Sequence, residues 1–426
     1  MIDSESAATA RALTVFGEED HGRLLAALAA RFHDLDLAEE ALQEALLRAV
    51  ETWPDSGIPR QPAAWLMSAA KNRAIDLIRL DATRTRNLAR LRIEDELRPG
   101  DHQDHATQLD EDIGIAEIPD ERLGLFFTCS HPTLKEEEQT ALILRFLAGL
   151  STVEVAAAFL TETTTMQQRI VRAKKRIAVT GIPFGRPGNE QVRERMPGVL
   201  RAVYLIFAQG FTPATGASRH RVDLQDEAVR LARLLVTLAP RDTEARGLLA
   251  LLLLTRSRAE ARTSAAGKPI PLAEQDRRVW DSRDIAEGLA LTRAAAGEDG
   301  AGIYTVQAAI AALHAEASAF ADTDWVQILV LYRMLYDLDP TPVVALNQAV
   351  VIGKVSDPEA GLAALEALAE DRWLLRHRPF HIARAITLEE CGRPGEAEEA
   401  YRAALACPGN DAESEYLESQ LNDLGS

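Results

Sequence analysis

Residues 149–177 read GLSTVEVAAAFLTETTTMQQRIVRAKKRI, and this stretch decides the fold. Ser151 followed by Glu154 predicts a capping box at the start of a short helix. The residues expected on the apolar face of that helix are Val153, Val155, Ala156 and Phe159. Residues 160–162 break the run, and a second helix is expected to begin at Thr163 or Thr164. The stretch therefore predicts a helix-turn-helix.

The second helix of this motif has an apolar face and a basic, amide-rich face. We expect Met166, Ile170, Ala173 and Ile177 to be buried. The positions expected to be exposed are Gln167, Gln168, Arg169, Arg172, Lys174, Lys175 and Arg176. Gln and Arg can form paired hydrogen bonds with base edges in the major groove, whereas Lys and Arg suit phosphates. The pattern favours duplex DNA binding over its alternative, a helical hairpin with a solvated basic face.

The overall charge of the chain opposes DNA binding unless the charges are segregated. The 426 residues carry a formal net charge of −18, with 47% hydrophobic and 26% charged residues, a composition that suits two to four globular domains. Residues 71–92 contain seven Lys or Arg against only Asp76 and Asp81, whereas residues 101–121 are acidic. The charges are therefore segregated along the sequence, as DNA binding requires.

Cysteine usage and the termini favour a cytoplasmic protein. Cys129, Cys391 and Cys407 have no metal-ligand spacing and form no even disulfide framework. The N-terminus lacks the features of a signal peptide, and the longest apolar run, Leu248–Leu254, is too short to span a bilayer. The sequence contains no nucleophile paired with a base, no phosphate loop and no metal-binding set. We therefore expect no enzyme activity, no cofactor, no metal and no membrane association.

Leu- and Ala-rich periodic stretches separated by Pro, Gly or Asp predict an all-α chain, apart from a possible short hairpin near residues 263–272. Breaks at residues 98–119 and 181–188 divide it. The expected parts are a helical domain at 1–98, an acidic linker at 99–119, the helix-turn-helix domain at 120–181 and a C-terminal helical domain at 189–426.

The first domain combines an acidic helix with an aromatic and basic one. Asp36 and Glu39 are expected to cap a helix that runs to Trp53, and residues 52–61 are expected to form a loop. The apolar face of this helix is expected to contain Leu42, Leu46, Ala49, Val50 and Trp53. Pro62 begins the next helix, on which Trp65, Asn72, Asp76 and Arg79 share one stripe. Trp65 fits either a core position or a platform on which a base stacks.

The C-terminal domain is expected to consist of helical hairpins. Residues 393–405 have the spacing of half a tetratricopeptide unit, and residues 357–368 resemble them at an offset of 37, close to the ~34-residue repeat. Stacked hairpins form a concave surface that suits a protein or peptide partner, and the alternative is a plain helical cap. Residues 274–281, EQDRRVWD, are expected to form a structured loop with internal ion pairs.

Four blocks in order resemble the bacterial extracytoplasmic-function sigma factors, group 4 of the sigma-70 family, in the subgroup with a tetratricopeptide-like C-terminal extension. DLAEEALQEALLRAVETWP (36–54) resembles sigma region 2.2, and PAAWLMSAAKNRAIDLIR (62–79) resembles regions 2.3 to 2.4. DERLGLFFTCSHPTLKEEEQTALILRFLAGL (120–150) resembles region 4.1, and residues 149–177 resemble region 4.2. The downstream segments VLRAVYLIFAQGF, EQDRRVWD, VQAAIAALHAEA and TPVVALNQAV resemble the extension, so the likeness spans nearly the whole chain.

The resemblance implies core RNA polymerase and promoter DNA as partners, with contacts to the β′ clamp and the β flap. The residues it implies for polymerase binding are Asp36, Glu39, Glu40, Gln43 and Glu44. Those for the upstream (−10) element and melting are Asp55, Ser56, Ile58, Trp65, Lys71, Asn72, Asp76 and Arg79. Those for the (−35) element are Thr165, Gln167, Gln168, Arg169, Val171, Arg172 and Lys175. The acidic linker is expected either to thread the RNA channel of the polymerase or to act as a solvated tether.

The predicted function is that of a sigma factor regulated through its C-terminal extension, which binds an unidentified protein or peptide. One competing hypothesis is a helix-turn-helix operator-binding regulator with a tetratricopeptide-like interaction domain, and another is a scaffold dominated by the repeats. The region 2 block favours the sigma factor, because an operator binder needs no polymerase-docking face and no melting helix. Gln167 stands where many family members have Lys or Arg, so no promoter motif is transferred.

Overall fold

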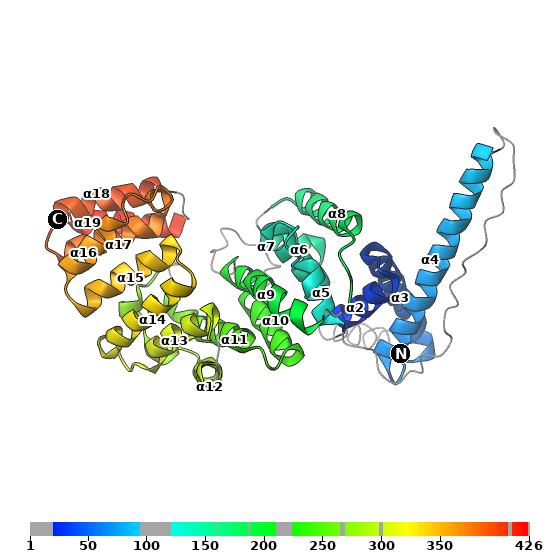
Figure 1. The fold of residues 1–426 in the computed structure, drawn as a ribbon, viewed down its shortest axis with the longest axis horizontal. Coiled ribbons are helices and arrows are strands. Elements are labelled where there is room, and N and C mark those ends of the chain that lie inside the picture. The colour runs from blue at the N-terminus through cyan, green and yellow to red at the C-terminus, as the bar shows by residue number, and fades with distance from the viewer. Residues whose placement is uncertain are drawn as a thin grey trace. The chain divides into compact units, whose positions relative to one another are not determined.

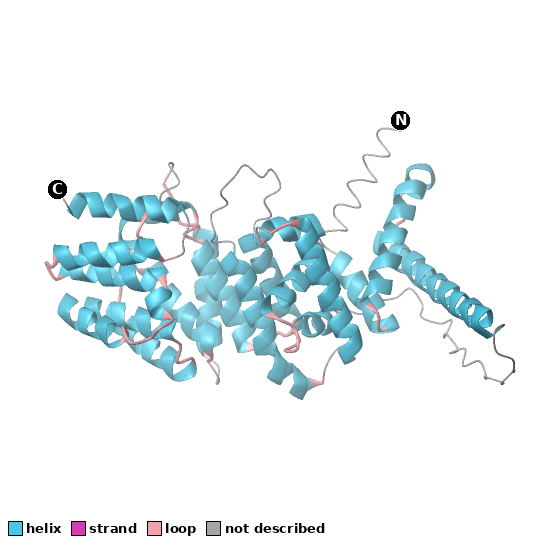
Figure 2. Cartoon of the chain, turned by 90° about the horizontal axis from the view of Figure 1, so that it is seen from above, coloured by secondary structure: helices cyan, strands magenta, loops and turns pink. Residues whose placement is uncertain are grey.

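The computed structural model describes residues 20–93, 121–159, 161–185, 188–209, 224–264, 269–297, 301–407 and 411–424. Contacts divide the chain into two compact units, each of which is considered separately. Unit 1 contains residues 1–202 and 219–222, and unit 2 contains residues 203–218 and 223–426. The described residues form helices and no β-strand, which confirms the predicted all-α class (Figures 1 and 2). The predicted linker 99–119 lies outside the described residues.

Unit 1 contains the helices of both predicted DNA-binding blocks. In chain order they are α2 (His21–Phe32), α3 (Leu35–Ser56), α4 (Pro62–Ile93), α5 (Arg122–Cys129), α6 (Glu136–Phe146), α7 (Thr152–Ala158), α8 (Thr163–Thr180) and α9 (Asn189–Gln209), whose last turns belong to unit 2. α3 packs against α4, α2 packs against α5, and α7 and α8 pack against each other and against α6. The predicted break at residues 181–188 falls inside unit 1, whereas the boundary between the units falls within α9.

The ends of α3 differ from those expected. Its N-cap is Asp34, whose carboxylate accepts the Leu37 N–H at 3.1 Å, so Asp36 and Glu39 are not caps. The helix continues through Pro54 to Ser56 rather than ending at Trp53. Gly57, at a φ of 83° that favours glycine, donates its N–H to the Trp53 carbonyl at 3.0 Å and ends the helix. The loop therefore begins at Gly57, and Pro54 lies in the last turn of the helix.

Most of the predicted apolar face of α3 is buried, including Leu42, Ala49 and Trp53. Val50 is an exception, because its side chain is 50% exposed. The same kind of error occurs at Val153 in α7, which is 60% exposed although Val155 and Ala156 beside it are buried. Both valines lie at the margin of an apolar stripe, where helical periodicity does not decide which side the neighbouring helix covers.

Unit 2 is a succession of packed helices. They are α10 (Leu224–Leu238), α11 (Thr243–Arg256), α12 (Ser282–Ala296), α13 (Ile303–Glu316), α14 (Trp325–Leu338), α15 (Pro342–Val355), α16 (Pro358–Ala367), α17 (Arg378–Glu390), α18 (Pro394–Ala406) and α19 (Asp411–Leu424), with short 3-10 turns between some of them. Neighbours in sequence pack against each other, for example α15 with α16 and α17 with α18. α16 and α18 begin with Pro358 and Pro394, which are 394 − 358 = 36 residues apart. The tetratricopeptide-like repeat itself stays a prediction.

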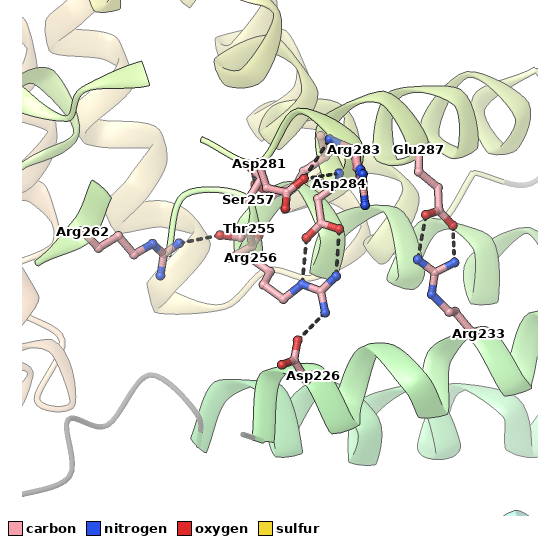
Figure 3. A network of polar contacts seen from close by, with 11 residues as sticks. Asp226, Arg233, Thr255, Arg256, Ser257, Arg262, Asp281, Arg283, Asp284 and Glu287 are labelled. Atoms are coloured by element: carbon pink, nitrogen blue, oxygen red, sulfur yellow. Dashed lines mark hydrogen bonds and ion pairs between the residues drawn. The ribbon is translucent and has the colours of Figure 1, made fainter. Parts of the chain in front are cut away.

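Ion pairs and a helix cap fasten the first helices of unit 2. Arg256 bridges Asp284 of α12, at 2.7 and 2.8 Å, and Asp226 of α10 at 2.5 Å (Figure 3). The Glu244 carboxylate of α11 accepts the N–H groups of residues 302, 304 and 305 at 2.8–3.1 Å, at the start of α13. A carboxylate at a helix N-terminus satisfies donors that the helix itself cannot pair. These contacts hold α10 to α13 in register.

Short connections complete the described part of unit 2. They include five 3-10 turns: η1 (Glu260–Arg262), η2 (Leu272–Glu274), η3 (Arg277–Val279), η4 (Phe320–Asp322) and η5 (Leu374–Arg376). The possible hairpin near residues 263–272 is reduced to one isolated antiparallel bridge between Thr263 and Pro269. Residues 274–281 form the predicted structured loop, and an ion pair between Asp276 and Arg278 at 2.7 Å lies within it. No described helix is long and apolar enough to cross a membrane.

Candidate promoter and polymerase interface

The helix-turn-helix forms as expected from its local sequence. The Ser151 N–H donates to the Glu154 carboxylate at 2.7 Å, and the Glu154 N–H donates to the Ser151 hydroxyl at 3.2 Å, which confirms the capping box. α8 begins at Thr163, and the residues it buries are Met166, Ile170, Ala173 and Ile177, all four as predicted. Because these side chains recur about every 3.6 residues, they lie on one face of α8, and the opposite face is turned away from α6 and α7.

The outward face of α8 carries amide and basic side chains in a row. The predicted (−35) residues that are exposed are Thr165, Gln167, Gln168, Val171, Arg172 and Lys175. Arg169 differs, because it is only partly exposed, forms an ion pair with Glu137 at 3.0 Å and lies over the Phe159 ring. An arginine held in this way has a fixed starting position but must give up its pairing with Glu137 to reach a base.

Two basic residues of α8 that the sequence placed on the exposed face are engaged within the protein. Lys174 has only 14% of its side chain exposed and forms ion pairs with Asp36 and Glu39 of α3. Arg176 donates to the Thr133 carbonyl at 3.0 Å and lies 3.5 Å from the Glu138 carboxylate. The basic ladder of α8 is therefore divided, with part of it exposed and part used to hold the helix against its neighbours.

The melting stripe of α4 is partly exposed and partly packed. Trp65 packs edge-on against the buried Trp53, with ring centroids 5.5 Å apart, and its own side chain is only partly buried. Asn72, Asp76 and Arg79 are exposed, and Lys71 is partly buried. One side of Trp65 therefore packs against Trp53, and part of its surface stays exposed to solvent. The side chains of α4 beyond residue 80 lie outside the described residues.

The residues assigned to a captured base lie at the end of α3 and just beyond it. Asp55 and Ser56 form the last turn of the helix, and Ile58 follows Gly57 in the loop. All three side chains are exposed, Ile58 to 40%. The sequence predicted a loop for the whole segment, so the structure changes the backbone setting of Asp55 and Ser56 and leaves their accessibility as expected.

Only some side chains on the acidic face of α3 are exposed, and the others are engaged in contacts within the protein. Glu40 and Gln43 are exposed, whereas Glu44 accepts a hydrogen bond from Arg73 of α4 at 2.7 Å. Glu39 has 17% of its side chain exposed and pairs with both Arg145 of α6 and Lys174, the latter at 3.2 Å. The residues predicted to bind polymerase therefore divide into an exposed pair and a set already engaged inside the protein.

The contact between the region 2 and region 4 blocks is close-packed as well as charged. Gly22 of α2 lies so near Leu147 that an added Cβ would come within 2.8 Å of the Leu147 carbonyl oxygen. Burial and the nearby Arg145 lower the pKa of His21 to about 4. Burial alone would lower the pKa of Lys174, but its hydrogen bonds and charge interactions with Asp36 and Glu39 outweigh burial and raise it. Near pH 7, His21 is therefore neutral and Lys174 is charged.

Sequence reasoning missed this contact because its partners are more than 100 residues apart, as in the pairing of Arg145 with Glu39. It also left open the packing of the first extension helix. Arg201 of α9 pairs with Glu136 of α6 at 2.6 Å, and the Arg195 guanidinium of α9 donates to the Phe127 carbonyl of α5. The N-terminal turns of α9 therefore lie against the helix-turn-helix domain and belong to the same unit.

Comparisons with known proteins agree with this architecture. Residues 19–84 match Sigma-70 region 2, residues 127–177 match Sigma-70 region 4, and residues 195–296 match a family of unknown function (DUF6596). An uncharacterized protein of Rhizobium meliloti (strain 1021) is 42% identical over 400 residues, which cover 94% of this chain and 93% of that protein. The two Sigma-70 matches fall on the helices that carry the two candidate DNA-binding faces.

The fold and these matches define a sigma-type initiation factor, a class of non-enzymatic proteins that recognise promoters and start transcription together with core RNA polymerase. Within that class, the chain belongs to the sigma-70 family and is an extracytoplasmic-function type sigma factor with a C-terminal extension. The resemblance drawn from the sequence is confirmed, and regions 2 and 4 imply interaction with core polymerase and promoter DNA.

Proposed function

We propose that this sigma factor reads the (−35) element with the exposed edge of α8. The observation that carries this assignment is the row formed by Gln167, Gln168, Arg172 and Lys175, all exposed on one helix whose opposite face is fully packed. Gln167 and Gln168 in the N-terminal half of the helix and Arg172 near its middle suit base edges, and Lys175 one turn later suits phosphate. Arg169 joins this set when it releases Glu137.

Recognition of the (−10) element and melting are assigned to the end of α3 and the exposed stripe of α4. Asp55, Ser56 and Ile58 form an exposed rim beside Gly57, where an unpaired base can be received. Trp65 offers a partly exposed ring for stacking, and Asn72, Asp76 and Arg79 extend the same stripe. Stacking on an aromatic ring is worth about 1–3 kcal/mol per base, enough to favour a melted base over a paired one when backbone contacts add to it.

Polymerase binding is assigned to the acidic face of α3. Glu40 and Gln43 are available at once, whereas Asp36 and Glu39 pair with Lys174 and Arg145. The β′ clamp can use the second pair only after the contact between region 2 and region 4 separates. The free protein is thus held in a form that competes with polymerase binding.

We propose that the factor is cytoplasmic and that its C-terminal extension regulates it by binding a protein or peptide partner. α9 supports this role, because Arg195 and Arg201 fasten its first half to α5 and α6 while its last turns belong to unit 2. Truncation after Pro183 is expected to abolish transcription, because it removes α9 from the helices on which it packs. A second truncation after Gln209 retains α9 and separates loss of this packing from loss of the rest of the extension. The proposal is contradicted if the form truncated after Pro183 transcribes at the level of the intact protein.

Run-off transcription tests the assignment as a whole. Purified protein with core polymerase is expected to initiate from the region upstream of its own gene, whereas the protein alone binds duplex DNA weakly because of its net charge of −18. Tight, sequence-specific duplex binding without core polymerase, together with no initiation, identifies an operator-binding regulator instead.

A further inference from the structure

Two arginines of unit 2, Arg258 and Arg277, lie over the indole ring of Trp280, and we call them the arginine cluster. The guanidinium carbon of Arg277 lies 4.6 Å from the centroid of the Trp280 ring, and that of Arg258 lies 5.7 Å from it. Arg262 is close enough to Arg258 for the two charges to repel each other. All three side chains are partly buried. Two positive charges therefore lie against one aromatic ring, and a third lies near one of them.

The two aspartates of the EQDRRVWD segment do not pair with this cluster. Asp276 pairs with Arg278, at 2.7 Å, and that arginine is 90% exposed. Asp281 is the N-cap of α12, and its carboxylate accepts two backbone N–H groups at 2.8 and 3.0 Å. Both aspartates of the EQDRRVWD segment therefore form local contacts, and neither pairs with Arg277, whose side chain is turned inward.

The inward arginine is only partly satisfied by the backbone. Arg277 donates from Nη1 to the carbonyls of His314 and Ala317 at the C-terminal end of α13, the latter at 2.7 Å. These carbonyls carry partial negative charge, so they hold one edge of the guanidinium. Within the part of the chain that the structure describes, neither Arg258 nor Arg277 forms an ion pair. Asp322 is near enough to favour the charge of Arg277 but does not pair with it.

Polar atoms around the cluster lack hydrogen-bond partners among the described residues. They are Nη2 of Arg277, Nε1 of Trp280 and Nδ1 of His314, and the Trp280 side chain is only 6% exposed. A buried donor without an acceptor costs about 1–3 kcal/mol, so three such atoms in one place are rare unless a partner is missing. This is an observation independent of the charge count, and it points to the same location.

Burial, and then repulsion between neighbouring arginines, lowers the pKa of the groups in and around the cluster. Burial lowers the pKa of Arg262 to about 10, with a further contribution from Arg258, and burial and Arg277 lower the pKa of Arg258. Burial and the two arginines lower the pKa of His314 to about 4, so it is neutral near pH 7. Cations of this kind, partly removed from water, are normally paired with an anion.

We propose that the arginine cluster and Trp280 form a binding site for a small oxyanion, a phosphate or carboxylate group, within the C-terminal extension. The oxyanion supplies the negative charge that the cluster lacks and accepts hydrogen bonds from the guanidinium groups, which suit planar, two-point contact with such oxygens. The indole ring of Trp280 forms the floor of the site. This inference concerns the extension alone and does not depend on the promoter-binding roles proposed above, but it would give the extension a small-molecule signal.

The test uses the full chain with inorganic phosphate and malonate as probes at matched ionic strength, and chloride as the control for ionic strength. Binding is followed by isothermal titration and by the fluorescence change of Trp280, which is assigned with Trp280→Phe. One or both oxyanions are expected to bind saturably, and the tighter one identifies the chemical group. Arg258→Gln is expected to weaken binding at least tenfold, about 1.4 kcal/mol.

Arg278→Gln is the matched control, because it removes the same charge from the same segment at an exposed position. It is expected to leave binding unchanged. If Arg258→Gln loses helix content by circular dichroism, Arg277→Gln takes its place. The proposal is overturned if neither oxyanion binds saturably, or if Arg278→Gln weakens binding as much as Arg258→Gln, because the response is then one of general charge.

Discussion

Lys174→Ala is the most direct test of the contact between region 2 and region 4. In the structure, Lys174 reaches from the recognition helix α8 to the carboxylates of Asp36 and Glu39, which we assign to polymerase binding. Removing the amine frees the Asp36 carboxylate and leaves Glu39 paired with Arg145 alone, without altering either carboxylate. The variant is therefore expected to bind core polymerase more tightly than the natural protein, although it has lost a positive charge.

The size of the effect follows from the exposure of the two ion pairs. Asp36 is 69% exposed, so its pair with Lys174 contributes a few tenths of a kcal/mol. Glu39 and Lys174 are 17% and 14% exposed and lie 3.2 Å apart, which places their contribution at about 1–2 kcal/mol. When binding requires a minor open form, loss of this stabilisation raises the open population in proportion, so affinity for core should increase about 5- to 30-fold.

The assay is equilibrium binding of labelled protein to core polymerase without DNA, at two salt concentrations. Lys175→Ala is the control, because it removes the same charge from the neighbouring, exposed position of α8 and should leave core binding unchanged. Glu39→Ala is expected to weaken binding, since it removes a polymerase contact. The reasoning is refuted if Lys174→Ala binds core as weakly as the natural protein, or more weakly, while Lys175→Ala is unaffected.

Four further outcomes are expected. Arg172→Ala should cost about 1–3 kcal/mol of discrimination between matched and mismatched (−35) duplexes in run-off assays, and an equal loss on both duplexes would mean that Arg172 contacts only phosphate. Trp65→Ala should reduce promoter opening, followed by permanganate reactivity, about tenfold more than closed-complex formation; equal losses would make it a core residue. Glu244→Ala should speed amide exchange at the start of α13 and cost about 2–4 kcal/mol locally, because four donors lose one acceptor; unchanged exchange would remove this role. His21 has a pKa of about 4 in the folded protein and 6.5 as a free group, so the unfolded chain binds its proton first and stability falls as pH drops from 6.5 toward 4. The loss should be about 2 kcal/mol at pH 5 by urea unfolding, and His21→Asn should flatten the profile.

Local sequence rules succeeded where the structure depends on near neighbours. The capping box of Ser151 and Glu154 depends on residues three apart, and the buried face of α8 depends on a period that the sequence displays directly. They failed at the margins of elements. Val50 and Val153 fit an apolar stripe, but whether a stripe's edge is covered depends on the next helix.

The amino-acid sequence by itself determined the helical class, the position of the helix-turn-helix, the segregation of charge and the membership of the sigma-70 family. These properties are written in residues that lie within a few turns of one another or in motifs of fixed order. Only the tertiary structure decided that Lys174 faces Glu39 rather than solvent, and that Arg258 and Arg277 lie over the same Trp280 ring. Both depend on which helices pack together, and that is set by the burial of whole faces, to which a single charged residue contributes little.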